Sequence, residues 1–500
     1  MKLPGVLDHR TGVDMRGVNR RHPWRLIGLL LALVVAPLAG AYATPALASP
    51  IDDVVSTFAY TQNMHPLGYS ARGNTASPFT ANSDIAFWGQ YAYHGNYDGF
   101  RIIDISAPAN PVEVLDYRDC AGNQGDVIVW GNILVRSWNS PAPAGATCDG
   151  EPVLPGVFGA WEGLHVFDIS NPADPDLVAS IETECGSHTA TGVPDLANNR
   201  LLIYNSPSSG ACPGIDIAQV PLSNPAGASY LRFEPAGRSC HDTGVILGEV
   251  KLAACAGGNG FTVWSLDAAD GGSLEDPAQL YSRTITGVTI GHSASFTWDG
   301  QVLIFGHEPG GGAQARCQAT SSTTDRTLFF FEAATGNLLG TILHPRPQTA
   351  QENCTWHNYN VVPTDKRYVL VAGNYQSGIS VVDFTDPANA YEAAYADPAP
   401  LAPTALGGDW STYWYNGRIY ESDITRGLLT WDLSDNVVAG AMNLDHLNPQ
   451  TQETSFPFKG TAFGKHKPAA DQRGFVVFGE SAPGDVSGGA GTGEGFSSGD

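Results

Sequence analysis

A segment that recurs about every 50 residues constrains this chain more than any other feature. Its clearest copies run from Gly99 to Asp104 and from Gly163 to Asp168, and each continues as Ile-Ser-x-Pro. Seven such units of β-branched and aromatic residues, separated by Gly/Pro turns, are typical of propeller blades. We therefore predict an all-β fold, a seven-bladed β-propeller of four-stranded antiparallel blades over residues 80–447. The other copies begin at Gly214, Gly260, Thr327, Gly378 and Gly427.

Each unit fits four strands, and the recurring segment is the third. Its final Asp, followed by Ser or Thr and often Pro, is turn chemistry, because Asp accepts bonds from nearby backbone and Pro fixes φ. We interpret four of these residues as structural: Asp104, Asp168, Asp383 and Asp432. The segment Val55–Tyr60 has no blade of its own. We expect it, within residues 52–72, to pair as an outer strand with the last blade and close the ring.

The chain ends differ from the repeats. Basic residues Arg20, Arg21 and Arg25, an apolar stretch and Ala46-Leu-Ala48 predict a signal peptide over residues 1–48 and export by the Sec or twin-arginine route. We assign residues 49–79 to an N-terminal segment with the closing strand, 448–479 to a C-terminal extension, and 480–500 to a disordered Gly/Ser/Asp-rich tail. No later stretch is apolar enough to span a membrane.

The charge of the chain excludes several partners. It has 26 Lys and Arg against 50 Asp and Glu, a net charge of −24 at pH 7. Such a surface repels nucleic acid and anionic lipid. We expect a secreted monomer with an unknown small-molecule or extracellular partner.

One position, just before the first strand of each unit, carries a polar side chain in every copy. Equivalent positions in a closed ring point in equivalent directions, so we expect these side chains to converge at the channel mouth. The seven residues are Asn82, Gln124, His188, His241, His292, His357 and Asp409.

The four histidines of this set predict a metal site. Imidazole suits zinc, copper, iron and nickel, so we expect a divalent transition metal, zinc or copper, held by His188, His241, His292, His357 and Asp409. His94, His307 and Glu421, at the ends of second strands, are candidates for an outer shell. Two alternatives remain open. The histidines could bond the next turn as a structural feature, or form a catalytic site without metal.

The cysteines map to the same end of the predicted blades. Some precede a first strand, and the others follow a second strand, and in a four-stranded meander these places share one face. An even number of cysteines in an exported protein favours disulfides. The predicted pairs are Cys120–Cys148, Cys185–Cys212, Cys240–Cys255 and Cys317–Cys354.

The repeated Gly-Φ-x-Φ-Φ-Asp-Φ-Ser-x-Pro units, where Φ is apolar, resemble the LVIVD-repeat family of secreted bacterial β-propellers, and Cys240-His241-Asp242 is similar to an opening in choice-of-anchor-B-type proteins. A more distant likeness is to selenium-binding-type propellers, which implies a metal near the channel for the four histidines. The resemblance implies fold and export more firmly than activity. Two functions follow: a metal-dependent oxidoreductase or hydrolase, or a non-catalytic extracellular or cell-surface interaction module. The sequence leaves open whether the protein is an enzyme.

Overall fold

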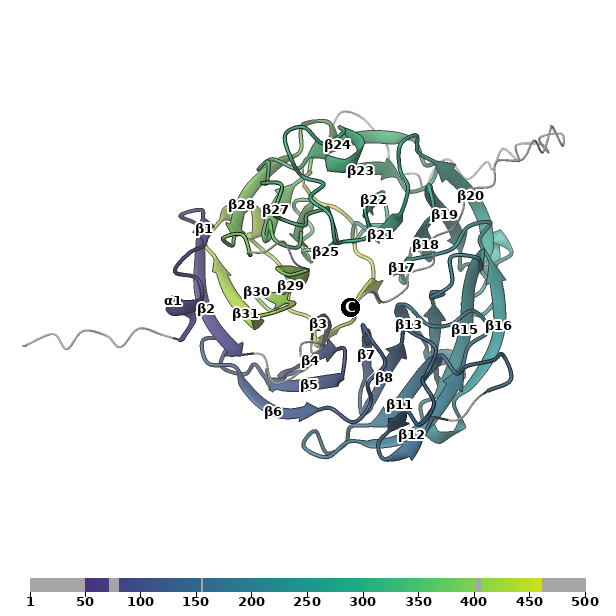
Figure 1. Cartoon of the computed structure of the whole chain (residues 1–500). Helices are drawn as coiled ribbons and strands as arrows, with labels where there is room; N and C mark the ends of the chain where they lie inside the picture. The colour runs from purple at the N-terminus through teal and green to yellow at the C-terminus, as the bar shows by residue number, and fades with distance from the viewer. Residues whose placement is uncertain (1–49, 72–80, 154–155, 402–405, 461–500) are drawn as a thin grey trace, which may run out of the picture. The chain divides into compact units, whose positions relative to one another are not determined.

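A computed structural model describes residues 50–71, 81–153, 156–401 and 406–460. The predicted signal peptide (residues 1–48), the tail (480–500) and the end of the C-terminal extension lie outside these residues. Seven mainly antiparallel sheets follow one another around a ring, as Figure 1 shows. The prediction of a seven-bladed β-propeller is confirmed.

The innermost strands of neighbouring blades contact one another around the channel. From the channel outward, blade one comprises β3 (Asn82–Trp88), β4 (Tyr91–Asn96), β5 (Gly99–Asp104) and β6 (Val112–Tyr117), and blade two comprises β7 (Val127–Trp130), β8 (Ile133–Trp138), β11 (Gly163–Asp168) and β12 (Asp176–Glu182). Blade three comprises β13 (Ala190–Asp195), β14 (Arg200–Asn205), β15 (Gly214–Pro221) and β16 (Ser229–Pro235). Blade four comprises β17 (Asp242–Ile246), β18 (Leu252–Gly257), β19 (Gly260–Ser265) and β20 (Ala278–Thr284).

The remaining blades follow the same plan. Their strands are β21 (Gly291–Phe296), β22 (Val302–His307), β23 (Thr327–Glu332) and β24 (Leu338–Leu343); β25 (Asn358–Val361), β26 (Val369–Gly373), β27 (Ile379–Asp383) and β28 (Tyr391–Asp397); and β29 (Asp409–Tyr415), β30 (Arg418–Asp423) and β31 (Gly427–Leu433). A hairpin of β9 (Thr147–Cys148) and β10 (Glu151–Pro152) lies between the second and third strands of blade two.

Helical structure in the described residues is short. It comprises α1 (Pro50–Val54) and 3-10 turns at Leu196–Asn198, Pro225–Gly227, Ala268–Asp270, Thr324–Arg326, Pro387–Asn389 and Asn436–Val438. Among these residues there is no helix of the length and apolarity that a membrane crossing requires.

The closing strand lies within the predicted residues 52–72, but later than the segment Val55–Tyr60. The fourth strand of blade seven is β2 (Met64–Ala71), which pairs antiparallel with β31. Val55–Tyr60 was the wrong choice: Tyr60 belongs to β1 (Ala59–Tyr60), which pairs with β28 at the outer edge of blade six. Burial explains the difference, because Met64 is fully buried in the core shared by blades six and seven.

Apolar residues of facing sheets form the cores between the blades. Ile304 and Leu328 of blade five, for example, pack with Leu370 and Val382 of blade six. Each blade therefore buries its faces against its two neighbours, which is how a repeat fold obtains a continuous core.

The predicted turns at the ends of third strands are present. Oδ1 of Asp104 accepts a hydrogen bond from the backbone N–H of Ser106 at 2.8 Å, and Oδ1 of Asp168 accepts one from Ser170 at 2.8 Å. The structural interpretation of these aspartates is confirmed.

A segment that was expected only as an extension lies in the channel. The strand β32 (His446–Leu447) pairs with β3 of blade one, and β33 (Thr451–Gln452) pairs in parallel with β17 of blade four. We call residues 446–452 the channel plug; this yellow segment crosses the centre of the ring in Figure 1.

Side chains of the channel plug also bind the innermost strands of blades two and three, β7 and β13. The Asn448 amide bonds both the N–H of Val129, at 2.7 Å, and its carbonyl, at 2.8 Å. The Thr451 hydroxyl donates to the Gly192 carbonyl at 2.8 Å. Gln450 of the channel plug also donates from Nε2 to Oδ2 of Asp242, at 3.3 Å. The channel plug therefore lies within the ring, in contact with the first residue of β17.

Candidate functional site

Four histidines from consecutive blades meet at the channel mouth. His188, His241 and His357 directly precede or lie within two residues of β13, β17 and β25, and His292 is the second residue of β21. Their ring centroids are 4.2 Å apart for His188 and His241, 3.8 Å for His241 and His292, and 4.3 Å for His292 and His357. Equivalent residues of neighbouring blades touch only if they point toward the channel. We call these four residues the histidine arc.

Hydrogen bonds at Nδ1 orient two rings of the histidine arc unambiguously. Nδ1 of His357 lies 2.6 Å from the carbonyl oxygen of Trp410, and Nδ1 of His241 lies 3.1 Å from Oδ1 of Asp242. Carbonyl and carboxylate oxygens only accept, so the proton is on Nδ1 in both rings. In the neutral form, Nε2 then carries the lone pair. A metal-binding histidine is commonly held in this way.

The other two rings have side-chain partners. Nδ1 of His188 lies 2.9 Å from Oδ1 of Asn139, and Nδ1 of His292 lies 2.6 Å from the hydroxyl of Ser293. Of the four rings in the histidine arc, His357 is therefore the one whose Nδ1 bonds a backbone atom. The other three rings bond side chains.

Most of the histidine arc is held neutral. Burial, with the nearby His241, keeps the pKa values of His188 and His292 well below the ordinary range. Burial lowers the pKa of His357 to about 3. Burial also acts to lower the pKa of His241, but the hydrogen bond and charge of Asp242 outweigh it and raise that pKa.

Two ring nitrogens face each other closely. Nε2 of His188 and Nε2 of His241 are 2.8 Å apart. Two lone pairs at this separation repel, so a positive species between the two nitrogens favours the arrangement. That species is either a proton, which the raised pKa of His241 favours, or a metal ion.

Asp242 and Glu308 supply the carboxylates of the site. Asp242 Oδ2 lies 3.6 Å from Nδ1 of His292, and Glu308 Oε1 lies 3.8 Å from Nε2 of His357. Each acid forms, with two histidines, a group whose ligand atoms lie within 4.8 Å of one another. Sequence reasoning did not assign either residue, although each directly follows a histidine that it singled out, His241 and His307.

Asp409 was expected to face the histidines, and the structure places it differently. Its carboxylate groups with those of Glu421 and Asp423. The reason is a β-bulge: Asp409 pairs with Asp423 and Ser411 with Ser422, which leaves Trp410 without a partner in the ladder. The freed Trp410 carbonyl binds His357, while the Asp409 side chain lies among the other carboxylates.

The expected outer-shell histidines bond other groups. Nε2 of His94 lies 2.7 Å from the Ser422 hydroxyl, and Nε2 of His307 lies 2.7 Å from the Thr324 carbonyl. His307 is still close enough to the histidine arc to lower the pKa of His292.

The two amide residues of the predicted ring have local roles. Asn82 is buried and donates from Nδ2 to the Asp423 carbonyl at 2.9 Å, which links blade one to blade seven. Gln124 is partly buried and hydrogen-bonds Tyr97.

Two further aspartates, Asp84 and Asp126, are buried on or beside the innermost strands of blades one and two. Burial raises the pKa of Asp84 to about 6, and burial with the charge of Asp84 raises the pKa of Asp126 well above its ordinary value. Each carboxylate accepts a backbone hydrogen bond, from Ile85 at 2.8 Å and from Ala190 at 3.1 Å. Both carboxylates therefore have hydrogen-bond partners within the fold.

Four disulfides surround the mouth, and they are the four predicted pairs. They join Cys120 to Cys148, Cys185 to Cys212, Cys240 to Cys255 and Cys317 to Cys354. Cys240 directly precedes His241, and Cys354 and Cys185 each lie three residues before a histidine of the arc. The disulfides therefore restrain the loops that carry the site.

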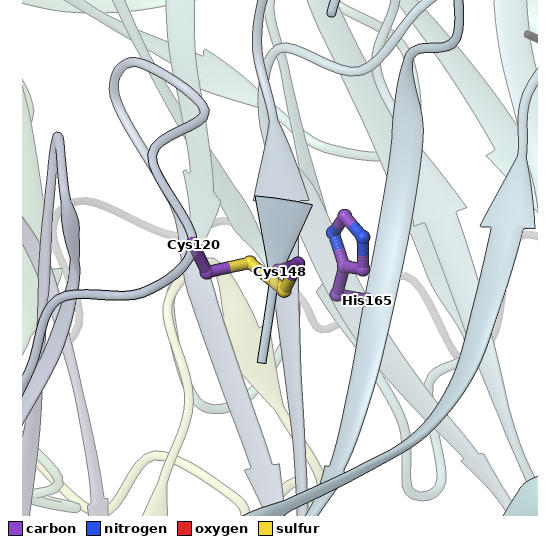
Figure 2. A group of neighbouring side chains, drawn as sticks. All are labelled: Cys120, Cys148 and His165. Carbon is purple, nitrogen blue, oxygen red and sulfur yellow. A yellow bond between two sulfur atoms is a disulfide. The ribbon is translucent and has the colours of Figure 1, made fainter. Parts of the chain in front are cut away.

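One disulfide has a histidine beside it. Figure 2 shows His165 next to the bridge between Cys120 and Cys148. The sulfurs are consumed in the disulfide, and the ring packs between Trp138 and Trp161, with centroids at 5.4 and 4.5 Å. This histidine is part of the core rather than of a metal site.

The fold and the blade signature define a repeat-built, disulfide-bonded β-propeller. The chain carries LVIVD repeats: the family model described as LVIVD repeat matches residues 81–119 and 158–183, in blades one and two. No curated protein matches the chain.

Two solved structures match the chain at low identity. One is the computationally designed Ika8 protein, with 11% identity over 74% of this chain and 99% of that chain and a TM-score of 0.42. The other is a putative 6-phosphogluconolactonase from Bacteroides uniformis ATCC 8492, with 10% identity over 72% of this chain and 88% of that chain and a TM-score of 0.44. Neither likeness bears on function.

Proposed function

We propose that this protein is an exported β-propeller that binds one transition metal ion, zinc or copper, through the histidine arc. The observation that carries the proposal is the orientation of the rings. Nδ1 of His241 and of His357 is bound to an acceptor, so Nε2 is left as the donor atom. Imidazoles whose Nδ1 atoms are anchored in this way are the usual preparation for metal binding.

The residues that would hold the ion are His188, His241, His292 and His357, with Asp242 and Glu308 beside them. This mixture of imidazole and carboxylate fits zinc or copper. A bound ion would supply Lewis acidity or redox chemistry, which suits a hydrolase or an oxidoreductase. Export is supported by the four disulfides, because such bonds persist in oxidising compartments.

A second function is favoured by one specific contact. The 2.8 Å separation of the His188 and His241 Nε2 atoms suits a shared proton, and the raised pKa of His241 supplies that proton. In that case the histidine arc is a structural polar cluster, and the protein is a non-catalytic extracellular or cell-surface interaction module.

Metal analysis distinguishes the two functions. The protein is purified without a histidine tag, stripped with a chelator, reloaded with zinc or copper and measured by mass spectrometry of the metal. We expect one equivalent per chain in the wild type and none in the double variant His241→Ala/His292→Ala, whose circular dichroism remains that of a folded propeller.

The matched control is His65→Ala, which removes a histidine from the outer strand of blade seven, where it bonds Ser434. This variant should bind metal like the wild type. Equal loading of the wild type and the double variant, or no loading of either, would reject the metal proposal and favour the interaction module.

A further inference from the structure

We propose that Asp409, Glu421 and Asp423 form a second cation site, in blade seven, for a hard divalent cation of the calcium, magnesium and manganese class. The site consists of oxygen ligands and is separate from the histidine arc. The proposal does not depend on whether the histidine arc binds metal.

The three carboxylates come from two neighbouring strands. Asp409 begins β29, and Glu421 and Asp423 lie at the end of the antiparallel β30. Their ligand oxygens all lie within 4.8 Å of one another. All three residues are buried, with exposures of 0%, 1% and 0%. The antiparallel pairing and the bulge at Trp410 bring them to one place.

Within the described part of the chain, most carboxylate oxygens of Asp409 and Glu421 receive no hydrogen bond from an N–H or hydroxyl group. No N–H or hydroxyl group of the described residues donates to either carboxylate oxygen of Asp409 or to Oε1 of Glu421, so these two acids face each other and, at these oxygens, have only each other as partners. Oε2 of Glu421 accepts a hydrogen bond from the Trp431 indole at 2.7 Å. Two buried carboxyl groups that face each other in this way need a positive species between them, either a cation or a proton.

The charge of the group points the same way. Arg426 pairs with Asp423, with Nη1 2.6 Å from Oδ2. Among the described residues, no cationic side chain forms an ion pair with Asp409 or Glu421. When both acids are ionised, two negative charges lie in a buried place, and a divalent cation would neutralise both.

Protons offer the competing way to neutralise these acids. Burial, followed by the charge of Glu421, raises the pKa of Asp409 well above its ordinary value, and burial also raises that of Glu421. A protonated pair needs no metal and is indifferent to added cations. A cation site responds to them at neutral pH, so the two explanations can be separated by binding.

The ligand set indicates the class of ion. Carboxylate oxygens are hard ligands, and they suit calcium, magnesium and manganese, whereas zinc and copper prefer sites with imidazole or thiolate. The oxygen group and the histidine arc should therefore take different ions.

Terbium luminescence tests this site directly. Trp431 is hydrogen-bonded to Glu421, so its indole can sensitise a terbium ion bound by this carboxylate. We expect saturable, tryptophan-excited luminescence from the stripped wild-type protein, displaced by calcium, magnesium or manganese but not by sodium at equal ionic strength. Manganese binding followed by electron paramagnetic resonance provides a second measurement without any lanthanide.

Variants locate the signal. Asp409→Asn/Glu421→Gln retains Trp431 and the side-chain volumes, and we expect it to lose saturable terbium and manganese binding. Asp84→Asn is a matched control, because this buried acid already accepts a hydrogen bond from Ile85. His292→Gln tests the independence of the two sites. Both controls should bind terbium like the wild type.

Two results would overturn the proposal. One is a wild-type protein that binds neither terbium nor manganese above the level of the double variant. The other is a wild-type signal that persists in Asp409→Asn/Glu421→Gln. Because the amide substitutions remove buried negative charge, we expect the double variant to fold, and its thermal unfolding is measured alongside.

Discussion

The carbonyl oxygen of Trp410 accepts a hydrogen bond from Nδ1 of His357 at 2.6 Å. Trp410 directly follows Asp409, whose side chain belongs to the oxygen-lined group of blade seven. One bulged strand therefore orients a ring of the histidine arc and positions a carboxylate of the second site. A change of conformation at Trp410 would reach both places.

Asp242→Asn should lower the pKa of His241. The carboxylate of Asp242 bonds Nδ1 of His241 and raises that pKa, and the neutral amide lacks the charge. A pH titration of the His241 ring by nuclear magnetic resonance measures the change in metal-free protein. If metal binds, its affinity should also fall by about 10- to 100-fold. The control Asp174→Asn changes an exposed carboxylate, and an equal pKa in all three proteins would contradict the role of Asp242.

His357 should make the metal-free protein sensitive to acid. Its pKa is about 3 in the folded state and about 6.5 in the unfolded chain, so the unfolded state binds more protons between these values. Stability is therefore complete above pH 6.5 and falls as the pH drops through this window, by about 2 kcal/mol at pH 5. Denaturant unfolding at pH 7 and pH 5 should show a smaller acid loss in His357→Gln. The same loss in both proteins would refute this prediction.

The disulfide that closes the longer loop should stabilise the protein more. The pairs Cys240–Cys255 and Cys317–Cys354 have sequence separations of 15 and 37 residues. In the chain-entropy description, replacing both cysteines by alanine costs about 3 kcal/mol for the first pair and about 4 kcal/mol for the second. Urea unfolding without reductant measures both variants. The opposite order would show that local packing, rather than loop entropy, dominates.

Asn448→Ala should destabilise the ring from inside the channel. The Asn448 amide bonds both the N–H and the carbonyl of Val129, and alanine leaves these two buried groups unsatisfied. Each unsatisfied group costs about 1–3 kcal/mol. Thermal and urea unfolding should show this loss, whereas Asn110→Ala, at an exposed turn, should change little. Unchanged stability of Asn448→Ala would mean that the channel plug binds only loosely.

The blades were predictable because each is marked locally. Gly99 and Asp104 bracket a third strand with turn chemistry, and that signal repeats around the ring. The closing strand was expected within residues 52–72, but its bounds were not, because the register of β2 shifts between Pro66 and Gly68 and this irregularity interrupts the alternation that identifies a strand.

The site was predictable only in part, for a similar reason. The histidine arc converges because equivalent positions of neighbouring blades must converge. The neighbours of Asp409 depend on the bulge at Trp410, and no periodicity in the sequence reports a bulge. The channel plug escaped prediction because Thr451 pairs with Val245, about two hundred residues earlier in the chain, through two-residue strands.

The channel plug also sets an order of events in folding. Residues 446–452 bind inner strands from blade one to blade four, so those strands gain their last partners only after nearly the whole folded part of the chain has been made. Blade seven, by contrast, waits for β31 to meet β2 from the opposite end of the sequence. Such distant pairings carry a high contact order, which slows folding. The ring should therefore acquire its final rigidity in one late step, and chains shortened before residue 452 should remain susceptible to proteases.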